Sequence, residues 1–203
     1  MTATSDLVRI CVIGDELVAG AGDPRALGWT SRVVARTLGE RNIELFTLAV
    51  PRENTTNLAN RWQEEVQRRF TASDDATQTR LVIALGRQDV KDSLSLARSR
   101  LNLANILDVA IAEGMAPLVV GPPPGDAFYA TSLKELSTAF QDVAARRRAP
   151  YVELFGPLEH HEQWLDDLAA SGTDMPQQAG YGLIAWLVLH SGWRRWLSLP
   201  EDE

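Results

Sequence analysis

Carboxylate side chains stand where apolar segments of the chain end, which is where chemistry would be placed. Asp15 and Glu16 close the first apolar run, Asp89 follows the third, and Asp174 precedes the last predicted helix. Paired carboxylates act as acid and base, or as a nucleophile, when their surroundings separate their pKa values. Glu16 acting with Asp89 or Asp174 is therefore one chemistry that these residue types allow, provided that the fold brings two of them together.

Metal and thiol chemistry have little support in the sequence. The chain holds three histidines and one cysteine, with no cysteine pair and no His-x-x-x-His spacing, so zinc is not indicated and no cofactor is expected. His160 and His161 lie in a charged stretch and are interpreted as a solvated surface pair, and His190 as a residue on the surface of the last helix. Cys11 lies in an apolar run and is expected to be a buried structural thiol.

Composition favours one globular domain over residues 1–203, with 45% hydrophobic and 23% charged residues. The net charge of −7 argues against nucleic acid and anionic membranes as partners, because both reward a basic surface. The N-terminal residues lack the pattern of a signal sequence, and no apolar run is long enough to span a membrane, so a cytoplasmic protein is expected. The oligomeric state does not follow from the sequence.

Apolar runs alternate with helical patterns along the whole chain. Strands alternating with helices imply crossover connections, and so a parallel sheet with helices on both faces, an α/β/α sandwich. Ligands of such folds bind beyond the carboxyl ends of the strands. The spacing predicts strands over 7–13, 43–50, 81–85, 117–120 and 151–155, and helices over 27–38, 54–70, 94–113, 133–148 and 178–197.

Four short segments stand at the ends of predicted strands or before the last helix. They are Gly14-Asp15-Glu16-Leu17, Gly86-Arg87-Gln88-Asp89, Gly121-Pro122-Pro123-Pro124, and Asp174-Met175-Pro176 with Gly180-Tyr181 downstream. In this order they resemble the sequence blocks of the SGNH (GDSL-type) esterases and lipases. The resemblance covers nearly the whole chain and implies a flavodoxin-like sheet of five parallel strands. It also implies hydrolysis of esters by a serine, a histidine and an aspartate, with an oxyanion held by hydrogen-bond donors.

Carried over position by position, the resemblance fails at each residue with a catalytic role. Glutamate replaces the nucleophilic serine, a thioether replaces the base, and glycine has no side chain to orient a base. Asp15 and Asp89 match aspartates with a structural role, so their presence indicates preserved turns. The altered positions are Glu16 for the nucleophile, Met175 for the histidine, Gly172 for the aspartate, Gln88 for the oxyanion asparagine and Arg52 for the oxyanion glycine, with Trp62 setting that register.

The sequence therefore predicts an SGNH-type fold with a degenerate pocket, and a non-catalytic protein that binds an unidentified small molecule or protein partner. The alternative is an active ester or acyl hydrolase that uses a non-standard constellation around Glu16 and Asp174. These residues leave open whether the protein is an enzyme, and they favour a protein without enzymatic activity. Because an unpaired buried carboxylate is unfavourable, we expect Glu16 to form an ion pair with Arg52.

A third hypothesis is a protein whose role is interaction alone. Trp186, Trp193 and Trp196 crowd the last predicted helix, and tryptophan is common in interfaces. The same spacing is typical of a helix that packs against a sheet, so we expect these tryptophans to be core residues.

Overall fold

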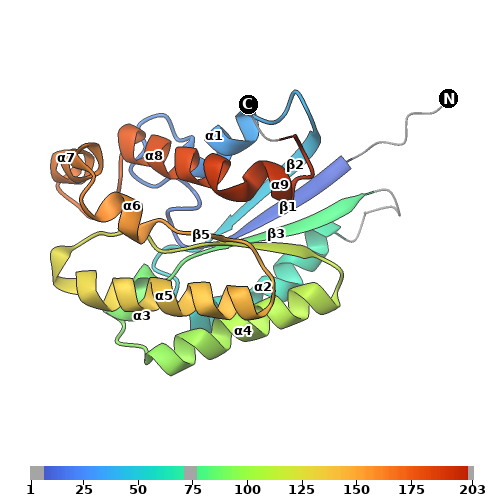
Figure 1. Ribbon diagram of the computed structural model, residues 1–203, viewed down its shortest axis with the longest axis horizontal. Helices are drawn as coiled ribbons and strands as arrows, with labels where there is room; N and C mark the ends of the chain where they lie inside the picture. Colours follow the sequence, from blue (N-terminus) through green and yellow to red (C-terminus); the bar gives the residue numbers. More distant parts are fainter. Residues whose placement is uncertain (1–6, 71–76, 201–203) are drawn as a thin grey trace.

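The computed structural model describes residues 7–70 and 77–200 and contains one five-stranded parallel sheet (Figure 1). The N-terminal residues, on which the expectation about a signal sequence rests, lie outside these ranges. The strand order is β2-β1-β3-β4-β5, the flavodoxin-like order, which confirms the predicted fold class. The strands are β1 (Leu7–Gly14), β2 (Asn42–Ala49), β3 (Gln78–Ala84), β4 (Ala116–Val120) and β5 (Tyr151–Val152).

Helices cover both faces of the sheet. Figure 1 shows α1, α8 and α9 over one face and α2, α4 and α5 over the other. The helices are α1 (Gly28–Ala35), α2 (Thr55–Phe70), α3 (Arg87–Lys91), α4 (Leu96–Ala112), α5 (Ala130–Arg146), α6 (Phe155–Glu159), α7 (Glu162–Ser171), α8 (Gln178–Val188) and α9 (Arg194–Trp196), with a 3₁₀ turn η1 (Ala127–Tyr129) and a π-helical segment η2 (Leu189–Trp193).

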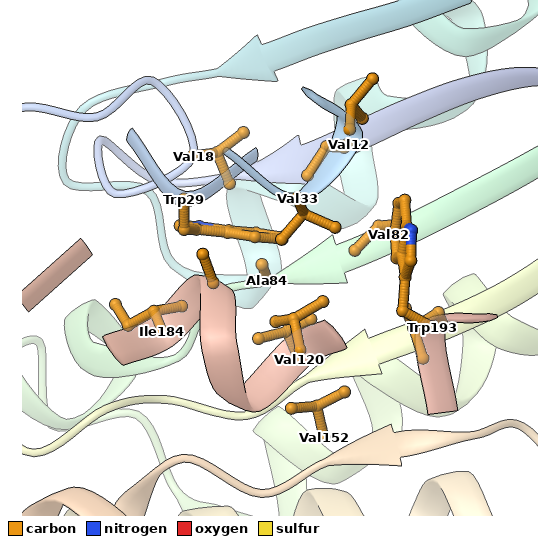
Figure 2. Close-up of a cluster of buried hydrophobic side chains, with 14 of the residues drawn as sticks. Val12, Val18, Trp29, Val33, Val82, Ala84, Val120, Val152, Ile184 and Trp193 are labelled. Carbon is orange, nitrogen blue, oxygen red and sulfur yellow. The ribbon is translucent and has the colours of Figure 1, made fainter. Parts of the chain in front are cut away.

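Each face of the sheet has its own apolar core, because successive strand residues point to opposite faces. On one face Val12 packs in a cluster with Trp29 of α1 and Ile184 of α8 (Figure 2). On the other face Cys11 packs with Leu58 of α2 in a second cluster. Burial raises the pKa of the Cys11 thiol to about 12, so the expected structural cysteine is confirmed as a buried thiol.

Local signals explain where several helices begin and end. The Asn54 side chain accepts a hydrogen bond from the Asn57 amide at the start of α2, and Ser95 does the same for Arg98 at the start of α4. Gly172 follows α7 with a left-handed φ of 64°, which glycine adopts without steric cost. The position that matches the family's aspartate is therefore a helix C-cap.

The structure corrects four expectations about the elements. Helix α1 ends at Ala35 and not at residue 38, and the strand expected over 151–155 ends at Val152, because residues from Phe155 onward form α6. Helices α3, α6 and α7 were not predicted. The helix expected over 178–197 is interrupted where Ser191 and Gly192 leave helical geometry.

The interruption in the last helix decides which of its tryptophans are buried. Trp193 and Trp196 lie in the core, as expected, but Trp186 is 56% exposed and contradicts the core interpretation. Within the described residues, no helix has the length and apolar character needed to cross a bilayer.

Candidate functional site

The candidate site lies where the strand order reverses, at the carboxyl ends of β1 and β3, which is where open α/β sheets bind ligands. Strands β1 and β2 pair in register up to Gly14 and Ala49, and the Val50 amide donates a hydrogen bond to the Gly14 carbonyl. The segment that carries Glu16 and the segment that carries Arg52 therefore leave the sheet side by side.

Asp15 holds the turn that follows β1. Its Oδ1 accepts the Leu17 amide at 3.0 Å, and its carbonyl accepts the Val18 amide at 3.1 Å. The Asp15 side chain is buried, and burial raises the pKa of its carboxyl to about 7. The positive charge of Arg87 opposes this rise, and the negative charge of Glu16 adds to it. The expected structural role of Asp15 is confirmed by these contacts.

Glu16 and Arg52 do meet, although not as an ion pair. The Arg52 backbone amide donates to Glu16 Oε2 at 2.6 Å, while the Arg52 side chain is exposed to solvent. In the part of the chain that the structure describes, no salt bridge joins the two side chains, so the expected ion pair is corrected to a main-chain hydrogen bond. Arg52 has a left-handed φ of 56°, a conformation that favours glycine and that agrees with its alignment to the family's glycine.

Gln88 does not direct its amide toward Glu16. Its Nε2 donates to Asp92 Oδ1 at 2.6 Å, one turn further along, and the other oxygen of Asp92 accepts from Asn54. The amide that would have served an oxyanion site is thus engaged with the carboxylate of Asp92.

Asp89 fastens α3 to the start of α2. One of its oxygens accepts the Thr55 amide and the other accepts the Thr55 hydroxyl, each at 2.7 Å. Asn102 of α4 donates to the same hydroxyl at 3.0 Å. Burial raises the pKa of Asp89, while the hydrogen bonds from Thr55 oppose that rise. The Asp89 carboxylate therefore accepts hydrogen bonds from the first residue of α2, which agrees with its predicted structural role.

Asp174 is held by two cations that the sequence reasoning did not single out. Arg87 donates to Asp174 twice, to its carbonyl and to Oδ2, both at 2.8 Å, and Lys91 also donates to Oδ2. Arg87 is only 4% exposed. Although burial opposes ionisation of Asp174, the charges of Arg87 and Lys91 hold its pKa below the ordinary value. Arg87 stands in the segment Gly86-Arg87-Gln88-Asp89, at the position that varies in the family's sequence block, so the resemblance assigns it no function.

Met175 packs as an apolar residue. It is partly buried against the cluster that contains Trp29, and a Cβ added to Gly22 would meet the Met175 Cβ at 3.2 Å. Its amide donates to the Thr173 hydroxyl. Neither Met175 nor Gly172 places a proton acceptor beside Glu16.

The three histidines lie away from this constellation. His160, His161 and His190 are all exposed, as predicted, and His190 is bonded to the carbonyl of its own helix. Over the described residues, no grouping of histidine, cysteine and acidic side chains is arranged to hold a metal ion.

A cleft of about 780 Å³ opens beside the Arg87–Asp174–Lys91 cluster. Its charged lining residues are Lys91, Asp126 and Asp174, and Tyr129 and Leu168 also line it. The volume falls within the range of small-molecule sites. A second space, close to the size of one water molecule, lies between Asp15 and Arg87 beneath the site.

Comparison with known proteins agrees with this geometry. Residues 12–183 match the family model described as GDSL-like lipase/acylhydrolase. Among curated proteins, no significant sequence match is found.

Several solved structures share the fold. A lipase/acylhydrolase from Enterococcus faecalis is 21% identical, with 96% of this chain and 98% of that chain covered and a TM-score of 0.75. The psychrotrophic esterase EstA from Pseudoalteromonas sp. is 17% identical over 94% and 98%, with a TM-score of 0.71. The acetylxylan esterase Axe2 from Geobacillus stearothermophilus is 15% identical over 96% of both chains, with a TM-score of 0.73. At these identities the likeness concerns the fold.

Proposed function

Because the chain belongs to the GDSL-like lipase/acylhydrolase family, we propose that it is a non-catalytic member of that family, one that binds a ligand or partner without hydrolysing it. The hydrogen bond between Glu16 and the Arg52 amide carries the proposal. Family resemblance expects a serine hydroxyl at Glu16 and an oxyanion donor at the Arg52 amide. Here the carboxylate of the chain itself occupies that donor, and an anion repels a second anion forming at the same place.

The other altered positions support the same proposal. Catalysis by an activated hydroxyl needs a base within hydrogen-bond reach and a group that orients the base. Met175 supplies a thioether packed on the core, and Gly172 supplies a helix cap. The Gln88 amide is engaged by Asp92. Each of these residues has a structural task, and none of them forms part of a proton relay with Glu16.

The alternative, hydrolysis by Glu16 with a second carboxylate, lacks that second group. Asp174 is neutralised by Arg87 and Lys91, and Asp89 is committed to the start of α2. Asp15 lies next to Glu16, but its carboxyl is buried behind the turn, and the buried Glu53 is paired with Arg61.

The cleft beside Asp174 is the ligand site that we propose, with the half-buried Lys91 and the exposed Asp126 among its lining residues. The buried state of the single cysteine is compatible with the cytoplasmic location that we also propose.

Hydrolysis of p-nitrophenyl acetate and p-nitrophenyl butyrate tests the proposal. We expect no turnover above the buffer rate for the wild-type protein or for Glu16→Ala. Glu162→Ala is the matched control, since Glu162 is an exposed acid in the first turn of α7. Wild-type hydrolysis that disappears in Glu16→Ala and persists in Glu162→Ala would show an active site at Glu16 and overturn the proposal.

A further inference from the structure

A second concave surface is lined by residues of α1 and α8. These two helices lie on the face of the sheet opposite to α2, α4 and α5 (Figure 1). It is a groove of about 550 Å³, and none of the residues at the positions that match the family's catalytic residues lines it. We call it the α1–α8 groove. Its charge, its aromatic residue and its shape are each informative.

The α1–α8 groove is basic in an acidic protein. Three arginines line it, Arg25, Arg32 and Arg36, and among the described residues no acidic side chain does, although the chain carries a net charge of −7. Arg32 is paired with the buried Asp23. Arg25 and Arg36 are exposed, and within the described residues neither guanidinium has an ion-pair partner. Two unneutralised charges of one sign therefore face solvent along one wall.

The opposite wall presents an exposed tryptophan. Trp186 is 56% exposed, whereas the other five tryptophans of the chain are at most 6% exposed. Its ring stacks on His190, with centroids 4.4 Å apart and an interplanar angle of 26°. His190 Nδ1 is 2.7 Å from the Trp186 carbonyl, which keeps the two rings together. Tryptophan and arginine are the residue types most enriched where protein interfaces gain their affinity.

The groove has the shape of a seat for a helix. Small residues, Ser31 and Ala35 on α1 and Gly182 on α8, separate the arginines from Trp186. The wall that runs from Gln178 to His190 is about 18 Å long at 1.5 Å per helical residue. That length matches about three turns of a peptide helix, which binds such grooves through apolar anchors at i, i+3 and i+4.

We infer that the α1–α8 groove binds an acidic, amphipathic helical segment of a partner protein. Acidic side chains of that segment would meet Arg25 and Arg36, and its apolar stripe would cover Trp186. A second copy docked groove to groove through a two-fold axis would set one basic surface against another, and like charges across an interface cost free energy.

A nucleotide fits the groove less well than a peptide. Phosphate binds readily at free helix N-termini, but the amides of Leu27 and Gly28 at the start of α1 already donate to the Asp23 carboxylate. The inference goes beyond the proposed function, because the same groove would serve an active or an inactive protein.

The test uses a fluorescein-labelled peptide of about 16 residues, with leucines on one helical face and glutamates beside them. Fluorescence anisotropy is measured with the full chain at low and high salt. We expect binding that salt weakens, and a loss of about tenfold or more in affinity for Arg25→Glu/Arg36→Glu and for Trp186→Ala. The control is Arg98→Glu/Arg148→Glu, which makes the same charge change at two exposed arginines away from the groove, one on α4 and one in the turn after α5.

Three results would overturn the inference. They are no binding by the wild-type protein, an equal loss in the control variant, and displacement of the peptide by AMP with the same dependence on Arg25 and Arg36. Size-exclusion chromatography of the unlabelled protein adds a fourth. A wild-type dimer that Arg25→Glu/Arg36→Glu converts to a monomer would assign the groove to a second copy of the chain.

Discussion

Replacing Asp174 by alanine should destabilise this protein more than any other change of an acidic residue on the cleft. The Asp174 carboxylate neutralises Arg87, which is only 4% exposed. In the variant, water could not replace the hydrogen bond that Arg87 loses. A buried charge that loses its partner costs several kcal/mol, whereas an exposed one costs little.

The magnitude follows from the contacts that the substitution removes. Asp174→Ala eliminates the charged hydrogen bond from Arg87 Nη2 and the contact with Lys91, but the bond from Arg87 to the Asp174 carbonyl remains. A hydrogen bond to a charged group contributes about 1.5–3 kcal/mol. The Lys91 side chain is 31% exposed, so its share is small. We expect a loss of about 3 kcal/mol in the free energy of unfolding.

Arg87→Met provides the opposite half of the comparison. It removes the buried charge and leaves Asp174, which is 23% exposed and keeps Lys91 as a partner. We expect a loss of about 1–2 kcal/mol, and a double variant that is less destabilised than the sum of the single ones.

Urea unfolding followed by circular dichroism near neutral pH measures all three variants. Asp166→Ala is the control, because Asp166 is exposed on α7 and should change the free energy of unfolding by less than about 0.5 kcal/mol. The reasoning is refuted if Asp174→Ala costs less than about 1 kcal/mol, or if Arg87→Met costs more than Asp174→Ala.

Three further predictions concern the turn and the glycines. The pKa of Asp15 is raised to about 7, so between about pH 4 and pH 7 the folded protein keeps a proton that the unfolded chain has lost. The free energy of unfolding therefore falls as the pH rises through this range. Asp15→Asn should remove that fall, and urea unfolding at about pH 5 and about pH 8 measures it. Gly14→Ala should lower the free energy of unfolding by more than about 4 kcal/mol, because the added Cβ would lie 1.9 Å from the Ala84 carbonyl oxygen. Gly172→Ala places its Cβ where no atom lies within 4 Å, so it should lose only about 1 kcal/mol, from the strain of a left-handed alanine. Thermal unfolding measures both variants. Glu16→Ser should show no turnover of p-nitrophenyl butyrate, because the introduced hydroxyl would have no base to activate it; turnover in this variant would show that a base is present.

The sheet could be predicted from the sequence because its strands are short apolar runs separated by turn residues. The segments that were missed have weaker signals. Helix α7 begins in a charged stretch with only Trp164 fully buried, so its apolar spacing is sparse. The run after β5 was read as a strand, although Phe155 and Leu158 are spaced for one buried helical turn.

The last helix shows how one glycine defeats a periodic pattern. Trp186 and Trp193 are seven residues apart, which places them on nearly the same face of a continuous helix. Gly192 has a φ of 108°, and the helix widens and breaks just before Trp193. The phase is lost there, so Trp193 enters the core and Trp186 faces solvent. Spacing alone could not show this, although an interior glycine is a recognised warning.

At the site, the sequence predicted which segments converge but not how their atoms meet. Strand order brings Glu16 and Arg52 together, and that much follows from a parallel sheet. Whether the guanidinium or the amide of Arg52 reaches the carboxylate depends on its backbone conformation, which is left-handed and turns the side chain to solvent. Arg87 was missed because a buried arginine is recognisable only once its partner is known, and Asp174 is 87 residues away.

The residues that identify the family in this chain are those whose contacts the fold needs with or without catalysis. Asp15 accepts a turn amide, and Asp89 accepts the first amide of α2. Removing either would leave a buried donor unsatisfied, at a cost of about 1–3 kcal/mol. A catalytic hydroxyl or imidazole has no such structural task, so its loss leaves the fold intact. The presence of Asp15 and Asp89 therefore reports the scaffold, and activity has to be argued from Glu16 and its neighbours.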